Sequence, residues 1–108
     1  MPELKGCQRR YLRGLAHRLK PSVFIGKQGL TEMVYMAIEQ ALISNELVKI
    51  SFMAFKQKEA KKRLAADIEH NTGCCLVGTV GHTALFYRPH PQPAKRRIIL
   101  PASSAGDD

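Results

Sequence analysis

The stretch Val23-Phe24-Ile25-Gly26-Lys27-Gln28-Gly29-Leu30-Thr31-Glu32 decides the fold, because it passes from a β-forming run through a glycine loop into a helix start. Its two glycines bracket Lys27 and Gln28, and glycine allows backbone angles that are closed to other residues. The first N–H groups of the helix after the loop have no partner within that helix and favour anions. The stretch therefore predicts a strand, a phosphate-binding loop and a helix with Thr31 as its N-cap.

The loop Gly26-Lys27-Gln28-Gly29 is weak evidence by itself, since an ordinary strand-to-helix turn also contains glycine. Its spacing fits neither a P-loop, which needs G-x-x-x-x-G-K-[ST], nor a three-glycine dinucleotide fingerprint. A G-x-x-G loop does clamp the sugar-phosphate backbone in KH domains. A simple turn and a clamp for a nucleic-acid backbone therefore both remain open for this loop.

A cationic helix is predicted before the loop, from about residue 4 to residue 19. Its predicted apolar stripe consists of Leu4, Tyr11, Leu12, Leu15 and Leu19, with Cys7 and Ala16 filling in. The opposite side carries Arg9, Arg10, Arg13, His17 and Lys20. Residues 4–20 hold six Lys or Arg and no acid, and like charges at i,i+4 lower helix stability. We interpret this face as one that binds a polyanion, the alternative being a solvated helix surface.

The elements that follow are predicted from periodicity, capping residues and turn signals. They are a strand at 22–25, a helix from Thr31 to near Asn45, a strand at 46–53, a helix at 58–71 ended by Gly73, and strands at 75–80 and 83–87 joined at Gly81-His82. Residues 98–100 could add an edge strand. The fold class is α/β, a single sheet of about four strands with three helices packed against it, in the order α-β-α-β-α-β-β.

The composition indicates one basic domain. The chain has 108 residues and a formal net charge of +8, which indicates a polyanionic partner, nucleic acid first and an anionic membrane second. We assign residues 1–100 to the domain and 101–108 to a disordered tail. No stretch approaches the ~18 apolar residues of a membrane span, and the N-terminus lacks the apolar segment of a secretory signal. We therefore expect a cytoplasmic protein.

The other candidate chemistry is sparse. Lys56 and Lys58 open a basic cluster at the start of a helix, where cations oppose the helix dipole, so anion binding and a plain surface both remain open. Phe24, Phe52 and Phe86 are expected in the core, which would leave no aromatic platform for base stacking and favour recognition of phosphates and shape. Four acids are expected on helix surfaces without converging: Glu39, Glu46, Asp67 and Glu69.

The cysteines and histidines do not predict a reactive site. Cys7, Cys74 and Cys75 form no C-x-x-C pair and are expected as reduced thiols, the adjacent pair serving in packing. The histidines at 17, 70, 82 and 90 lack ligand spacing relative to the cysteines. We expect no metal, no cofactor and no catalytic activity.

An ordered set of motifs resembles the CRM domain family, named for chloroplast RNA splicing and ribosome maturation. The motifs are Leu15-Ala16-His17-Arg18-Leu19-Lys20-Pro21, Ile25-Gly26-Lys27-Gln28-Gly29-Leu30-Thr31-Glu32, Ile38-Glu39-Gln40-Ala41-Leu42, Glu46-Leu47-Val48-Lys49-Ile50, Asn71-Thr72-Gly73, and Val80-Gly81 followed by Leu85-Phe86-Tyr87-Arg88. The resemblance covers about residues 4 to 100 and is far more specific than the loop alone. One departure is Cys74-Cys75, where family members often carry small residues.

This resemblance implies an RNA-binding domain with a KH-like G-x-x-G loop, in a fold similar to the C-terminal domain of bacterial translation initiation factor three. Stand-alone bacterial members are associated with precursors of the large ribosomal subunit, whereas plant members carry several copies and act in group II intron splicing. A lone domain with short tails resembles the bacterial kind.

The resemblance and the basic residues together define the expected RNA surface. Its residues are Gly26, Lys27, Gln28, Gly29, Arg9, Arg10, Arg13, His17, Arg18, Lys20, Lys56 and Lys58. We expect a monomer that binds rRNA in a precursor of the large ribosomal subunit and takes part in its assembly. The alternatives are a general chaperone of structured RNA, a splicing or translation factor and, more remotely, a small enzyme acting on a phosphorylated substrate.

Overall fold

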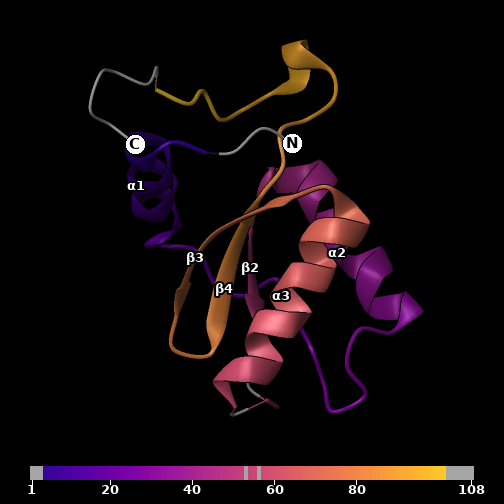
Figure 1. Cartoon of the computed structure of the whole chain (residues 1–108). Helices are drawn as coiled ribbons and strands as arrows, with labels where there is room; N and C mark the ends of the chain where they lie inside the picture. The colour runs from indigo at the N-terminus through magenta and orange to yellow at the C-terminus, as the bar shows by residue number, and fades with distance from the viewer. Residues whose placement is uncertain (1–3, 53, 56, 102–108) are drawn as a thin grey trace.

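Three α-helices and a four-stranded sheet form the part of the chain that the computed structural model describes, residues 4–101 apart from 53 and 56 (Figure 1). In chain order the elements are α1 (Gly6–Ala16), β1 (Val23–Phe24), α2 (Glu32–Asn45), β2 (Leu47–Ser51), α3 (Lys58–Thr72), β3 (Cys75–Val80), β4 (Thr83–Tyr87) and a 3-10 turn (Pro93–Lys95). The predicted order is confirmed, and β3 and β4 have the predicted bounds.

The sheet is mixed, with the strand order β1-β2-β4-β3. β1 runs parallel to β2, and the other two pairs are antiparallel. A register shift between Leu76 and Gly78 interrupts the β3–β4 ladder, as a β-bulge does. Because successive side chains in a strand point to opposite faces, each strand supplies two different surfaces.

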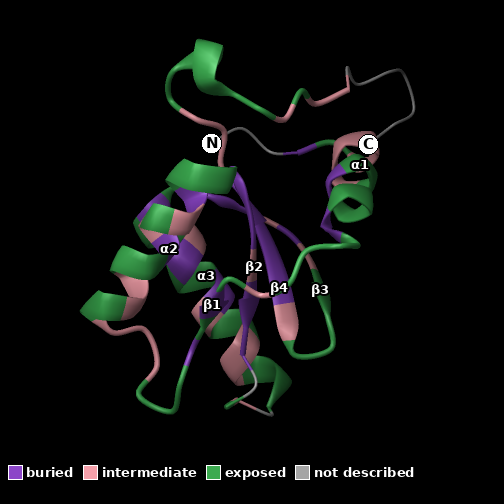
Figure 2. Ribbon diagram, turned by 180° about the vertical axis from the view of Figure 1, so that it is seen from behind, coloured by how far each residue is buried: buried purple, intermediate pink, exposed green. Residues whose placement is uncertain are grey.

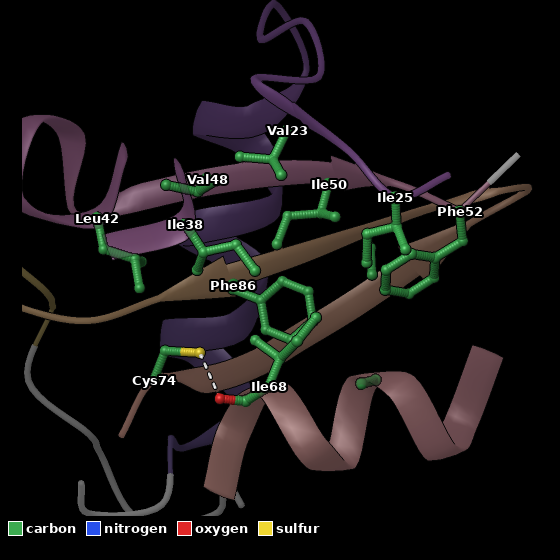
Figure 3. Packing of buried hydrophobic residues seen from close by; sticks show 12 residues of the cluster. Val23, Ile25, Ile38, Leu42, Val48, Ile50, Phe52, Ile68, Cys74 and Phe86 are labelled. Carbon is green, nitrogen blue, oxygen red and sulfur yellow. Dashed lines mark hydrogen bonds between the residues drawn. The ribbon is translucent and has the colours of Figure 1, made fainter. Parts of the chain in front are cut away.

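One face of the sheet is covered by α2 and α3. Its buried cluster joins Ile38 and Leu42 of α2 with Ile68 of α3 and with strand residues such as Ile50 and Phe86 (Figure 3). Ala65 of α3 is also buried here, and Val34 and Ala41 of α2 pack at the margin of the cluster. We call this surface the closed face.

The other face of the sheet carries α1. Its buried cluster consists of Leu4, Leu12, Ala16, Leu47, Cys75, Val77, Leu85 and Tyr87. Ile98 and Leu100 from the C-terminal segment pack against its margin. With only 11 residues, α1 covers the part of the sheet near the end of β4 and leaves the part near the β3–β4 turn uncovered (Figure 2). We call the uncovered part the open face.

The predictions for the first helix need two corrections. The helix ends at Ala16 rather than near residue 19, and the chain leaves it through short-range hydrogen bonds from His17 N to Gly14 O and from Leu19 N to Ala16 O. The predicted apolar stripe is confirmed only in part, since Tyr11, Leu15 and Leu19 are exposed. Only Leu12 and Ala16 of the helix are buried, because so short a helix touches the sheet along one narrow row.

Phe24 is not part of the core, contrary to the prediction. Its side chain is 68% exposed, while its neighbours Val23 and Ile25 are buried in the closed face. The alternation of a β-strand explains the difference, since Phe24 must point to the face opposite its neighbours, where no helix reaches it. Phe52 and Phe86 are buried as expected.

Glu46 organises the junction between α2, β2 and the C-terminal segment, and it is buried rather than on a helix surface. Its carboxylate accepts hydrogen bonds from the backbone N–H of His90 at 2.9 Å, of Arg97 at 2.7 Å and of Ile98 at 3.1 Å. These bonds hold the C-terminal segment as an irregular chain, so residues 98–100 do not form the suggested edge strand. The predicted tail at 102–108 and the end of the predicted strand at Met53 lie outside the described residues.

Arg88 links three elements at the same end of the sheet. Its guanidinium donates to the two carboxylate oxygens of Glu39 at 2.7 and 2.8 Å and to the Thr72 carbonyl at 2.7 Å. A bidentate pair of this kind fixes geometry as well as supplying energy. Glu39 is therefore a structural partner of β4, and its hydrogen bonds to Arg88 hold the pKa of its carboxyl below the usual value against the opposing effect of burial.

Candidate nucleic-acid interface

The glycine loop is a tight turn between β1 and α2. Gly29 N donates to Gly26 O at 3.0 Å, and Gly29 has a φ of 78°, a conformation that favours glycine. Ile25 N donates to Ser51 O at 3.0 Å, which anchors the start of the loop to β2. The side chains of Lys27 and Gln28 between the two glycines are exposed.

The helix after the loop begins where it was predicted. Thr31 lies at the N-cap of α2, and its hydroxyl oxygen accepts a hydrogen bond from Val34 N at 3.3 Å. This bond satisfies one of the N–H groups of the first turn. A rigid turn therefore presents Lys27 and Gln28 at the positive end of a 14-residue helix.

The loop and α1 lie at opposite corners of the molecule in both ribbon views (Figures 1 and 2). The residues expected to bind RNA thus form separate zones rather than one cluster. The segment 17–22 connects them, running from the end of α1 to β1 across the sheet (Figure 2).

Arg9 is held by the protein itself. One guanidinium nitrogen donates to the Leu76 carbonyl at 2.7 Å and to the Val77 carbonyl at 3.3 Å. These carbonyls lie at the bulge of β3, so Arg9 fastens α1 to the edge of the sheet. We correct the view of α1 as one uniform cationic face, because this arginine performs a structural task there.

The other basic residues of this region are exposed, but they do not share one helical face. Arg10 and Arg13 lie on α1, whereas His17, Arg18 and Lys20 follow its last residue. They form a cationic band along the end of α1 and the segment that leads to β1.

A hollow of about 430 Å³ lies between the end of α1 and the open face. Its rim carries Arg13, His17 and Lys49, and its floor includes Gly78, Val80 and Leu85. Neither the hollow nor the place of Lys49 at its rim was predicted from the sequence. The signal was present in β2, where Val48 and Ile50 point into the closed face and alternation places Lys49 on the other side.

Lys49 also positions the segment after α1. Its ammonium group donates to the Leu19 carbonyl at 2.9 Å, and its own carbonyl accepts from Ser22 N at 2.9 Å. The charge of Lys49 is therefore fixed at the border between the hollow and the cationic band.

The third basic zone lies at the start of α3. Lys58 is the first residue of that helix and is exposed, whereas Lys56 lies outside the described residues. Lys58, Lys61 and Lys62 line a second hollow, of about 500 Å³, between α3 and the β3–β4 hairpin. The Lys61 Nζ lies 2.8 Å from His82 Nδ1 in the turn of that hairpin.

The thiols are in packing positions. Cys74 and Cys75 are free and buried, as predicted, on the closed face and the α1 face respectively. Burial raises the pKa of the Cys74 thiol, although a hydrogen bond with Thr72 acts in the opposite direction. A thiol with a raised pKa is a poor nucleophile at neutral pH.

Neither a metal site nor a membrane-spanning helix is present in the part of the chain that the structure describes. It contains no group of three or more His, Cys, Asp or Glu residues arranged to hold a metal ion. None of the helices described there combines the length and the apolar character needed to cross a bilayer.

Comparison with known proteins now places the chain in a family. The sequence model of the CRS1/YhbY (CRM) domain matches residues 4–88, which include the loop, α1 and all four strands. The chain belongs to this family. The resemblance drawn from the motifs is thereby confirmed.

Relatives of this CRM domain have been named in several bacteria. An RNA-binding protein of Haemophilus influenzae is 40% identical over 101 residues, covering 94% of this chain and 98% of the relative. The Bacillus subtilis protein named "Probable RNA-binding protein YqeI" is 33% identical over 98 residues, covering 91% and 99%. The solution structure of SAV1595 from Staphylococcus aureus superposes with a TM-score of 0.77 at 34% identity, covering 92% of this chain and all of that one.

Proposed function

We propose that this CRM domain binds RNA through its phosphate backbone, without catalysing a reaction, and takes part in assembly of the large ribosomal subunit in the cytoplasm. The observation that carries the proposal is the exposed Lys27-Gln28 turn held by Gly29 at the start of α2. A net charge of +8 and relatives named as RNA-binding proteins support it. The role in ribosome assembly rests on the family resemblance alone.

The glycine loop and the cationic band make different contributions to binding. The loop offers backbone N–H groups and one lysine to a phosphate, whereas the cationic band offers exposed side chains along a longer path. Phosphate contacts of this kind position an RNA without reading its sequence. Structured rRNA, with its dense backbone, is a suitable ligand for such a surface.

The loop is tested by the double substitution Lys27→Asp, Gln28→Asp. Both glycines stay, so the turn is kept, and acids near a helix N-terminus do not weaken the free protein. Placing carboxylates where phosphates are expected weakens binding by about 2 kcal/mol or more, which is about thirtyfold. Affinity is measured by fluorescence anisotropy with a labelled rRNA fragment, and folding by circular dichroism.

A matched control separates the loop from net charge. Gln92→Asp with Lys95→Asp changes the charge by the same amount at exposed positions of the C-terminal segment. We expect this control to lose little affinity. Equal losses in the two double variants would show that only net charge matters, and a native-like loop variant with full affinity would show that the loop is only a turn.

The assembly role is tested by sedimentation of cell lysate through a sucrose gradient. Migration with free large subunits or their precursors supports it. Migration with mature ribosomes favours a translation factor, and a position at the top of the gradient contradicts a ribosomal role while leaving RNA binding to the anisotropy assay.

A further inference from the structure

The open face of the sheet carries a row of side chains that the phosphate-binding proposal does not use. Strand register places Phe24 beside Ser51, Ser51 beside Thr83, and Thr83 beside Val80, so the row crosses all four strands. Paired residues share a face of the sheet. Phe24 and Val80 stand at its two ends and are largely exposed, whereas Ser51 between them is buried.

The hollow beside α1 adjoins this row. Thr83 and Val80 belong to both, and Leu85 and Gly78 lie one step closer to the helix. The aliphatic part of Arg13 forms a wall over Gly78, since a Cβ built on this glycine would lie 3.5 Å from Arg13 Cδ. An apolar floor thus opens toward solvent under a charged rim.

The two charged residues of the rim, Arg13 and Lys49, are both cations. Arg13 comes from α1, His17 directly follows that helix and Lys49 comes from β2, and the residues lining the hollow include no acid. A floor of this character accepts a flat apolar group, while the rim favours an anion beside it. An unpaired nucleotide, with its base and its phosphate, combines the two.

The glycine loop begins two residues after Phe24. A backbone clamped at Lys27 would therefore pass Phe24 before it reaches the open face. Three inter-strand spacings of about 4.8 Å separate β1 from β3, so the two exposed ends of the row lie roughly 14 Å apart. The four-stranded sheets of RRM domains stack two or three bases over a similar width.

We propose that the open face binds unpaired nucleotides of RNA, with one base stacked on Phe24 and a second seated in the hollow beside α1. This proposal rests on the proposed RNA-binding function and adds a preference for single-stranded segments. It also replaces the expectation, drawn from the sequence, that the protein has no exposed aromatic platform.

A protein partner is the other class of ligand for an exposed apolar surface. A rim that carries Arg13 and Lys49 and no acid favours RNA, since an apolar protein interface excludes charge from its core. The experiment distinguishes the two.

The test uses the full chain and two RNA probes, a single-stranded 12-mer of uridine and a 12-base-pair duplex without unpaired bases. Phe24→Ala should weaken binding of the single strand at least fivefold, as expected from loss of base–aromatic stacking, and should change duplex binding less than twofold. Met36→Ala is the matched control, because Met36 is 66% exposed on α2, which covers the opposite face.

A spectroscopic readout reports stacking directly. The chain contains no tryptophan, so Phe24→Trp creates a single reporter and Met36→Trp a control reporter. The single strand should quench the fluorescence of the Phe24→Trp variant, and the duplex should not. The Met36→Trp variant should respond to neither.

Three results contradict the proposal in different ways. Binding of both probes by the wild type, with no loss in Phe24→Ala and no quenching in Phe24→Trp, overturns it and assigns the open face to a protein partner. Equal losses for single strand and duplex show that Phe24 acts on the backbone rather than on bases. Failure of the wild type to bind either probe contradicts the proposed RNA-binding function itself.

Discussion

The two faces of the sheet are built from the same strands but are covered to different extents. On the closed face, α2 and α3 bury residues in or next to every strand, from Val23 in β1 to Cys74 just before β3. On the other face, α1 and the C-terminal segment cover one end, and Phe24 and Val80 at the opposite end stay exposed. Coverage separates the side chains that stabilise the fold from those available to a ligand.

Charged side chains also differ between the two faces of the sheet. Arg13, His17 and Lys49 border the open face, while the ion pair of Arg88 with Glu39 closes the end of the covered layer. The described residues that line the hollow of the open face include cations and no acid, as expected for a surface that meets a polyanion.

The largest predicted effect comes from creating a cavity in the buried cluster of the closed face. Phe86 is fully buried, so Phe86→Ala should lower the free energy of unfolding by about 3–5 kcal/mol through lost burial and the cavity left behind. The control Val80→Ala, an exposed position on the open face, should change it by less than about 0.5 kcal/mol. Urea denaturation followed by circular dichroism measures both.

The comparison between Phe86 and Val80 can be contradicted by experiment. If Phe86→Ala does not fold, Phe86→Leu provides a smaller truncation with an intermediate loss expected. Similar losses at Phe86 and Val80 would show that the two faces do not differ in their contribution to stability.

The next effect concerns the segment that covers the top of the α1 face. Glu46→Gln keeps the size of the side chain but places an amide NH₂ against backbone N–H donors, so a loss of about 2 kcal/mol is expected. The variant should release the C-terminal segment without changing RNA affinity. Hydrogen exchange at Arg97 and Ile98 should accelerate, and unchanged protection there would contradict the anchoring role.

The same carboxylate predicts a pH dependence. Burial acts to raise the pKa of Glu46, but the three backbone N–H groups outweigh it, and the pKa is lowered from its ordinary 4.5. The pKa of Glu39 is also lowered from 4.5, by the hydrogen bonds from Arg88. Stability from a group with a lowered folded-state pKa is present above the unfolded value and is lost as pH falls through the folded one.

Unfolding free energy should therefore stay nearly constant from about pH 7 to 5 and fall below that range. Glu46→Gln should lose less stability on acidification than the wild type, because it carries one fewer such carboxylate. Urea titrations at several pH values measure this difference. Parallel pH profiles of the two proteins would show that Glu46 does not contribute.

Local signals predicted much of this molecule, and contacts between distant segments account for the rest. The Thr31 cap, the Gly73 end of α3 and the bounds of β3 and β4 depend on neighbouring residues, and all were predicted correctly. The exposure of Phe24 depends on how far α1 reaches across the sheet, which no local pattern specifies. The burial of Glu46 likewise requires a segment more than 40 residues away.

The candidate nucleic-acid interface was likewise predicted only where its residues are neighbours in the sequence. The glycine loop is a contiguous stretch and was predicted from the sequence. The hollow is lined by residues of α1, β2, β3 and β4, which are far apart in the chain, so it could not be predicted. Alternation in β2 does predict which face Lys49 occupies, but only once the closed face has been identified.

The smallest predicted effect separates two arginines one helical turn apart. Arg9→Ala removes the hydrogen bonds to Leu76 and Val77, so a stability loss of about 1 kcal/mol is expected for this half-buried group. Arg13→Ala should leave stability within about 0.5 kcal/mol, lower RNA affinity and reduce the slope of log affinity against log salt by about 1. Urea denaturation and anisotropy titrations at several salt concentrations measure the two quantities. A single cationic face, as the sequence alone suggested, would instead make both variants lose salt dependence equally without loss of stability. Because both residues lie on one helix and lose the same charge, any difference between them reflects what each guanidinium contacts.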